Sequence, residues 1–137
     1  MIQGKDLMKG NIVEYNGYYA VVYSIFGPYP NSDERFNNKE CIDLILGGMT
    51  TVTIDELNPV TLTEEILFKC GFGWNIRFQA NANEEYFFKL CECYPIEKGY
   101  NIVLKKDNFL LVPEVKYLHD FQNWFKLTTK QELEIKL

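Results

Sequence analysis

Two cysteines lie two residues apart, at Cys91 and Cys93, and their spacing is the feature of this 137-residue chain that best suits metal binding. Residues two apart in an extended strand point to the same face, so both thiols could reach one ion. A tetrahedral zinc site needs two further ligands, and the chain offers Cys70, Cys41 and His119. None of these lies at the short spacing of a paired zinc knuckle, so reduced, buried thiols are the favoured interpretation. We therefore predict no metal and no cofactor, and Cys91, Cys93, Cys70 and His119 are the candidates to check.

His119 is the sole histidine and the natural candidate for a general base. Asp120 or Glu114 could orient it, with Cys70 or a threonine as nucleophile. However, neighbouring residues on a helix point about 100° apart, which places Asp120 poorly for that task. We expect His119 to make hydrogen bonds where the helix meets a sheet, and we predict no catalytic residue.

Paired carboxylates are the third kind of residue that could do chemistry, because hydrolytic enzymes use two of them across a cleft. Adjacency in sequence does not establish such a cleft, and solvated surface charge is the favoured explanation. The chain also has no glycine-rich phosphate loop, nucleophile elbow or dinucleotide fingerprint. The pairs are Glu64-Glu65, Asp33-Glu34 and Glu84-Glu85.

Aromatic residues are concentrated near one end of the chain, and they provide the best candidate for a binding surface. Strand alternation predicts that half of them are core, while the others could form an exposed groove for a protein partner, since tyrosine is favoured at interfaces. The residues predicted to bind a partner are Tyr18, Tyr23, Phe26, Tyr29 and Phe36, from a cluster that also includes Tyr15 and Tyr19.

Charge and hydropathy limit the partners. The net charge of −5 disfavours nucleic acid, whose binding depends on neutralising phosphates. No segment has the length and apolar character of a membrane span or a signal peptide, so we expect no membrane contact and a cytoplasmic protein with reduced cysteines. The oligomeric state stays open.

The first half of the chain has the pattern of a small, bent β-barrel with five strands. Two hairpins are predicted: residues 11–15 and 18–25 around Asn16-Gly17, and residues 41–46 and 50–54 around Gly47-Gly48. Residues 27–40 contain two prolines and three asparagines without a period, which predicts a long exposed loop. The stretch from Lys9 to Ile25 resembles the opening of SH3-like and KOW-type modules, although the ligand-binding aromatic motif of SH3 domains is absent.

The second half alternates helical and strand patterns. Thr63 caps a short helix that Gly71 ends, and four strands follow at residues 74–79, 85–93, 100–105 and 109–112. Turns are expected at residues 81–83 and at Pro95. An amphipathic helix carrying Leu118, Phe121, Trp124 and Phe125 leads to a final strand at residues 133–137.

Two blocks of the sequence, residues 58–72 (NPVTLTEEILFKCGF) and 117–137 (YLHDFQNWFKLTTKQELEIKL), resemble the recurring segments of a family of short proteins from Bacteroides-type bacteria and their phages and mobile elements. That family usually has glycine where Thr129 stands, so the helix is expected to end here in a less favourable turn. The resemblance implies a common fold and brings no catalytic residues with it.

Together these patterns predict an α+β fold. An SH3-like β-barrel over residues 1–60 would pack on an antiparallel sheet with two short helices over residues 61–137. The predicted function is a non-enzymatic protein-interaction module of phage or mobile-element origin. A nucleic-acid-associated accessory protein, by analogy with other SH3-like barrels, and a small enzyme of another type remain as alternatives.

Overall fold

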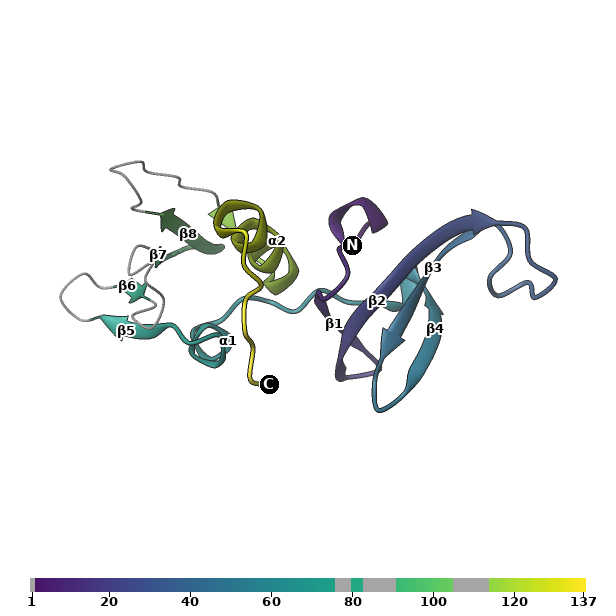
Figure 1. Cartoon of the computed structure of the whole chain (residues 1–137), viewed down its shortest axis with the longest axis horizontal. Helices are drawn as coiled ribbons and strands as arrows, with labels where there is room; N and C mark the ends of the chain where they lie inside the picture. The colour runs from purple at the N-terminus through teal and green to yellow at the C-terminus, as the bar shows by residue number, and fades with distance from the viewer. Residues whose placement is uncertain (1, 76–79, 83–90, 105–113) are drawn as a thin grey trace. The chain divides into compact units, whose positions relative to one another are not determined.

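The computed structural model describes residues 2–75, 80–82, 91–104 and 114–137, and within them the fold is α+β (Figure 1). The chain forms two compact units. The first comprises Met1–Val60 with Leu118–Trp124, and the second comprises Thr61–Tyr117 with Phe125–Leu137. The helix α2 (Leu118–Thr129) contributes its first seven residues to the first unit and the rest to the second. Each unit is described by itself below.

The first unit contains a four-stranded antiparallel sheet in the order β1-β2-β3-β4. Its strands are β1 (Ile12–Tyr15), β2 (Tyr18–Tyr29), β3 (Lys39–Ile45) and β4 (Met49–Thr53). Both predicted hairpins are confirmed. Asn16 and Gly17 have φ values of 49° and 80°, the left-handed pair that a tight hairpin turn of this kind requires. Each hairpin brings the apolar positions of its two strands to one face of the sheet.

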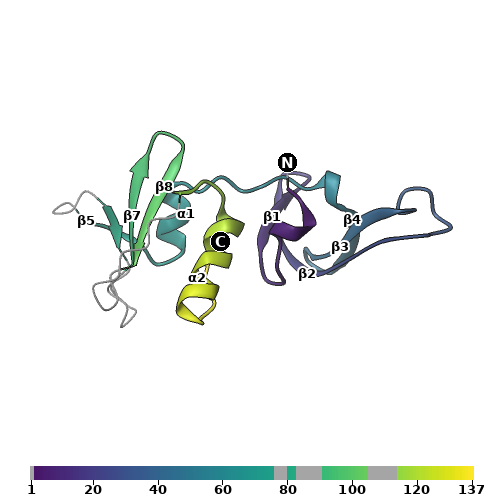
Figure 2. The same cartoon turned by 90° about the horizontal axis from the view of Figure 1, so that it is seen from above.

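Strand β2 is the longest element of the first unit, and with β3 it extends as an arm that curves away from the other strands of the sheet (Figures 1 and 2). The register shifts between Val22 and Ser24 and again between Phe26 and Tyr29. Such irregularities bend a strand and increase its twist. The prediction of one long loop over residues 27–40 is therefore wrong at both ends, because Gly27–Tyr29 and Lys39–Glu40 belong to strands, and residues 30–38 alone connect them.

After β4 the chain returns to the first strand. The short 3-10 helix η2 (Ile54–Glu56) turns it, and Asn58 then forms an isolated bridge with Glu14 through two backbone hydrogen bonds of 2.9 Å. The place of a fifth strand, beside β1, is thus taken by one residue and not by a full strand. The expected five-stranded pattern reduces to four strands and this bridge.

The core of the first unit lies on the inner face of the curled sheet. Val22 on β2 and Ile42 and Leu44 on β3 point to this face and are fully buried. The 3-10 helix η1 (Gly4–Asp6) and the residues beside it supply Ile2 and Leu7 to the same cluster. Burial of this apolar area is the main source of stability for the unit.

The second unit begins with helix α1 (Glu64–Lys69), which forms as the sequence predicts. The Thr63 hydroxyl accepts a hydrogen bond from the amide of Ile66, and Glu64 and Glu65 occupy the first turn. Both features offset the exposed amides of a helix start. Gly71, at a φ of 87°, ends the helix, and the Phe72 amide then donates to the carbonyl of Leu67.

The second sheet has the order β5-β6-β7-β8-β9, and all its pairings are antiparallel. The strands are β5 (Gly73–Asn75), β6 (Ala80–Ala82), β7 (Cys91–Ile96), β8 (Gly99–Leu104) and β9 (Glu114–Val115). The predicted meander is present, but two turn predictions are wrong. Residues 81–82 lie within β6, and Pro95 lies within β7 opposite Tyr100, so the turn falls at residues 97–98 instead. The strand predicted at residues 109–112 lies outside the described residues.

Helix α2 is confirmed, but the strand predicted at residues 133–137 does not form. One backbone hydrogen bond, from the Lys136 amide to the Lys69 carbonyl, holds this segment, and Leu133 is buried. The helix ends at Thr129, whose hydroxyl donates to the Phe125 carbonyl at 2.7 Å. Lys130 adopts the left-handed conformation at a φ of 62°, so the strained position falls one residue after Thr129.

Candidate functional site

Five aromatic side chains of β2 are exposed, and we call them the aromatic strip: Tyr18, Tyr19, Tyr23, Phe26 and Tyr29. Tyr18 and Tyr29 near the two ends of the strand are 66% and 64% exposed, and Phe26 between them is 36% exposed. Four of the residues predicted to bind a partner, Tyr18, Tyr23, Phe26 and Tyr29, are thus exposed, and fewer than the expected half of the cluster pack in the core. Of the remaining two, Tyr15 and Phe36, both are partly buried, and Tyr15 packs against the core.

The strand pattern explains this exposure. Ala20 and Val22 fill the inward positions of β2, which leaves Tyr19 and Val21 on the outer face. After the register shift at Tyr23, Ile25 packs toward the core and Ser24 and Phe26 face outward. Small and branched residues therefore occupy the inside of β2, and Tyr19 and Phe26 lie outside. Tyr18 has the same parity as Ala20 and is exposed as the first residue of the strand.

The outer face of the sheet has one row of polar residues beside Phe26. Ser24, Asp43 and Thr51 lie opposite one another on β2, β3 and β4. The Ser24 hydroxyl donates to Asp43 Oδ2 at 2.9 Å, and the Thr51 hydroxyl donates to Asp43 Oδ1 at 2.6 Å. Two hydroxyls thus fix the orientation of one carboxylate on the outer face.

On the other side of this row, the outer face is apolar. Val21 lies opposite Ile45, and Ile45 lies opposite Met49. Ile45 and Met49 are 43% and 55% exposed. The sequence analysis missed Asp43, Thr51, Ile45 and Met49. The signal that could have found them is the alternation of residues 41–45 and 49–53 across Gly47-Gly48.

The connection over residues 30–38 is ordered by its own side chains. Asp33 Oδ1 accepts from the Arg35 amide at 2.9 Å, and Asn31 Oδ1 accepts from the Asp33 amide at 2.8 Å. The Asn38 amide donates to the carbonyl of Tyr29, the last residue of β2, and so closes the connection. These turns, in which Asn and Asp side chains mimic the backbone, give the end of the arm a defined shape.

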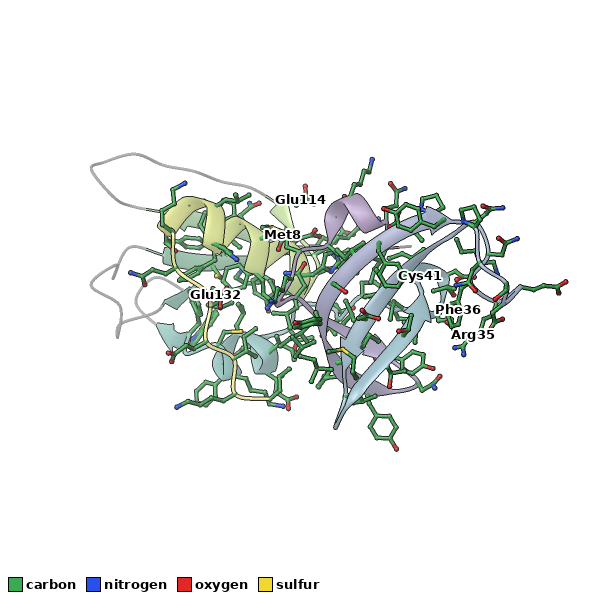
Figure 3. The ribbon with its side chains drawn as sticks, turned by 45° about the vertical axis from the view of Figure 1, so that its right-hand side comes forward. Met8, Arg35, Phe36, Cys41, Glu114 and Glu132 are labelled. Carbon is green, nitrogen blue, oxygen red and sulfur yellow. The ribbon has the colours of Figure 1, made fainter. Side chains whose placement is uncertain are left out.

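Arg35 connects this segment to η2. Its guanidinium lies 2.9 Å from Glu56 Oε1, and Glu56 Oε2 also accepts from the amide and the hydroxyl of Thr53. Partial burial acts to raise the pKa of Glu56, but the hydrogen bonds from Thr53 and Arg35 outweigh it and hold this pKa below its usual value. Figure 3 shows Arg35 and Phe36 at the outer end of the arm, with Cys41 on β3 closer to the sheet.

Two cations of the first unit already lie on aromatic rings. The Lys9 ammonium is 4.5 Å from the centre of the Tyr23 ring, and the Arg35 guanidinium is 5.0 Å from that of Phe36. Both distances are within the range of cation–π attraction. One ring of the aromatic strip and the nearby Phe36 ring therefore each contact a cation of the chain.

The four cysteines were the candidate metal ligands. Cys41, Cys70 and Cys93 are buried and form no disulfide, and the side chain of Cys91 lies outside the described residues. Over the part of the chain that is described, no group of three or more His, Cys, Asp or Glu side chains is placed to hold an ion. Burial raises the pKa of Cys70 to about 12, so its thiol is protonated at neutral pH. Burial and the negative charges of Asp43 and Glu56 likewise raise the pKa of Cys41.

His119 is buried in the first turn of α2, with Nε2 at 3.4 Å from Asp120 Oδ1. Asp120, which was expected to be poorly placed to orient His119, therefore does contact its ring. Burial lowers the pKa of His119, while the carboxylates of Asp120 and Asp6 act in the opposite direction. A buried, largely neutral imidazole fits the structural role expected from the sequence.

The Gln-Asn pair in the middle of α2 has a structural role that the sequence did not reveal. Gln122 Oε1 accepts from the Ile12 amide at 2.8 Å, and Gln122 Nε2 donates to the Gly10 carbonyl at 3.0 Å. Asn123 Oδ1 accepts from the buried Asn11, and Asn123 Nδ2 donates to the Asp6 carbonyl. We call these contacts the amide clamp, because they hold the segment that precedes and begins β1.

Searches of protein-family models, curated proteins and solved structures each find no match for this chain. None of the described helices is both long and apolar enough to cross a membrane. The surface that stands out from the geometry is thus β2 with its aromatic strip.

Proposed function

We propose that the protein is a non-enzymatic, cytoplasmic protein-interaction module and that the aromatic strip is its binding surface. The observation that carries this proposal is the exposure of five large rings along one strand. Scattered exposed apolar residues are normal, but a row of them on a rigid element is typical of interaction sites. Tyrosine contributes large contact area at low entropic cost, which suits such a surface.

The arm gives the surface a defined shape. Strand β2 pairs with β3 along most of its length, and the ordered connection over residues 30–38 closes its end. Phe26, Tyr29 and Phe36 are therefore presented from a braced scaffold. A partner would lose little affinity to ordering this surface on binding.

The residues considered for catalysis support a non-enzymatic role. The thiols of Cys41 and Cys70 have raised pKa values, which disfavours the nucleophilic thiolate. His119 is buried and engaged with Asp120. Two cations of the first unit are already engaged within the chain, since Arg35 pairs with Glu56 and Lys9 lies over Tyr23, and this disfavours the nucleic-acid alternative.

An SH3-like barrel is part of the same proposal for the first unit. The support is the order of elements: two hairpins, one 3-10 turn, then a return of the chain to pair with β1 at Glu14. Origin in a phage or mobile element is supported by the resemblance of the two sequence blocks described above.

Affinity capture with quantitative mass spectrometry tests the binding surface. The bait is the full chain, and the lysate is from a Bacteroides-type bacterium, as the resemblance suggests. The strip variant carries Tyr18→Ser, Tyr23→Ser and Tyr29→Ser. The matched control is Phe68→Ser, which removes a ring that is 72% exposed in the second unit.

We expect a protein partner that the wild type and the control enrich and the strip variant does not. Partners that all three baits enrich equally would contradict the proposal, as would the absence of any specific partner. Circular dichroism of the strip variant checks that its fold is intact.

A further inference from the structure

Asp43 is the carboxylate at the centre of the outer face, and its surroundings indicate what kind of partner fits there. We propose that Asp43 receives a basic side chain, Lys or Arg, from an extended segment of the partner that lies along the aromatic strip. This inference rests on the proposed function and adds the chemistry of the partner to it.

The geometry prepares Asp43 for a cation. Ser24 and Thr51 each donate one hydroxyl proton to it, from the two neighbouring strands, so both oxygens are fixed in orientation. Among the described residues no cationic side chain forms an ion pair with Asp43. A charged hydrogen bond to such a fixed carboxylate is among the stronger polar contacts that proteins make.

An aromatic ring lies beside this carboxylate. Phe26 is paired with Cys41, which precedes Asp43 by two residues on β3, so Phe26 and Asp43 share the outer face. A guanidinium paired with Asp43 would have the Phe26 ring within reach for a stacking contact. Lys9 over Tyr23 and Arg35 over Phe36 are examples of the same contact made by the chain's own cations.

The distribution of charge favours a cationic partner over a neutral one. The first unit carries nine carboxylates and four lysines or arginines, a formal net charge of −5. The second unit carries ten of each, so all the net charge of the chain resides in the unit that bears the strip. Such a field attracts a basic segment and accelerates its association.

Two ten-residue peptides test the inference on the full chain. Both have a Gly-Ser backbone; one carries three arginines, and the other carries three citrullines, which are neutral and nearly the same shape. Fluorescence anisotropy at physiological salt measures their binding. We expect the arginine peptide to bind at least about tenfold more tightly than the citrulline peptide, the scale of one charged hydrogen bond.

Variants then locate the site. Asp43→Asn should weaken the arginine peptide about tenfold and leave the citrulline peptide unchanged, because the amide keeps hydrogen bonds to Ser24 and Thr51 but loses the charge. Glu34→Gln removes one charge from an exposed position of the same unit and should change either affinity less than threefold. Asp43→Thr is a second neutral variant in case Asp43→Asn is unstable.

The inference would be overturned by equal binding of the two peptides, by wild-type affinity in both Asp43 variants, or by an equal effect of Glu34→Gln. Phe26→Ser separates it from the proposed function. If Phe26→Ser weakens binding and the Asp43 variants do not, the strip binds its partner without the charge. If the Asp43 variants weaken binding and Phe26→Ser does not, the charge site stands and the strip fails.

Discussion

Two segments of this protein are rich in aromatic residues, and the fold uses them in opposite ways. In β2, Tyr18, Tyr23 and Tyr29 are 44% to 66% exposed. In α2, Phe121 and Phe125 are 0% and 1% exposed. Strand β2 fills its inward positions with Ala20 and Val22, whereas α2 buries its two phenylalanine rings.

This contrast teaches that aromatic content alone does not identify a binding surface. The rings of α2 match a helical period that creates one apolar face, so burial is the outcome that the pattern dictates. In β2, alternation places Tyr19 and Phe26 outside, Tyr23 lies at the register shift, and Tyr18 and Tyr29 are the end residues of the strand. Substitutions in the two segments should therefore separate stability from binding.

The largest effect is expected at Phe121. Phe121→Ala removes a fully buried ring and should lower the free energy of unfolding by about 3–5 kcal/mol, because the surrounding side chains close the cavity only in part. Urea unfolding measures it. Tyr29→Ala, at a position that is 64% exposed, is the matched control and should stay within about 0.5 kcal/mol of wild type. A comparable loss at Tyr29 would show that the strip belongs to the core.

The amide clamp should give the next largest effect. Gln122→Ala leaves the Ile12 amide and the Gly10 carbonyl without their partner and should cost about 1–3 kcal/mol in the free energy of unfolding. Amide hydrogen exchange should show faster exchange at Ile12. Gln131→Ala, an exposed glutamine just after α2, serves as the control. Unchanged protection at Ile12 would mean that the clamp contributes nothing.

Glu56 predicts how stability depends on pH. Its pKa in the folded protein is lowered, so its contribution to stability is fully present above the unfolded-state pKa of a glutamate, about 4.3, and is lost as the pH falls through the lowered folded value. Glu56→Gln should therefore flatten the stability profile between about pH 5 and the acid limit. Thermal unfolding at a series of pH values measures it. A Glu56→Gln profile parallel to the wild type would contradict the assignment.

The smallest effect is expected at the end of α2. Lys130→Gly relieves a left-handed conformation that glycine adopts freely, and should raise the free energy of unfolding by about 0.5–1 kcal/mol. Thr129→Gly should not stabilise, because it removes the hydroxyl contact to the Phe125 carbonyl. If Thr129→Gly raised the free energy of unfolding and Lys130→Gly did not, this account of how the helix ends would be wrong.

Local signals predicted much of the fold. Asn16-Gly17 and Gly47-Gly48 specified both hairpins, and Thr63 and Gly71 marked the limits of α1. These predictions succeeded because a few neighbouring residues decide the backbone geometry. The errors fall where distant contacts decide. Residues 133–137 alternate like a strand, but one backbone hydrogen bond, to Lys69, is all that joins their backbone to another segment among the described residues. Pro95 was expected in a turn, but it lies within strand β7.

The candidate site was predictable in part. The sequence identified the aromatic cluster but could not tell its exposed members from its core members, because a register shift in β2 changes which side chains face outward. Asp43 stands out as a candidate because the hydroxyls of Ser24 and Thr51, on two other strands, donate hydrogen bonds to it. The amide clamp joins residues more than a hundred positions apart, and no local pattern reports such a contact.

The amide clamp also has a consequence for the edge of the first sheet. The primary amide of Gln122 is bonded to β1 as the backbone of a neighbouring strand would be, at Gly10 and Ile12, and Asn58 occupies the next site along, at Glu14. An open strand edge is a template on which another chain can polymerise. One glutamine thus occupies backbone groups at this edge to which another chain could otherwise bind.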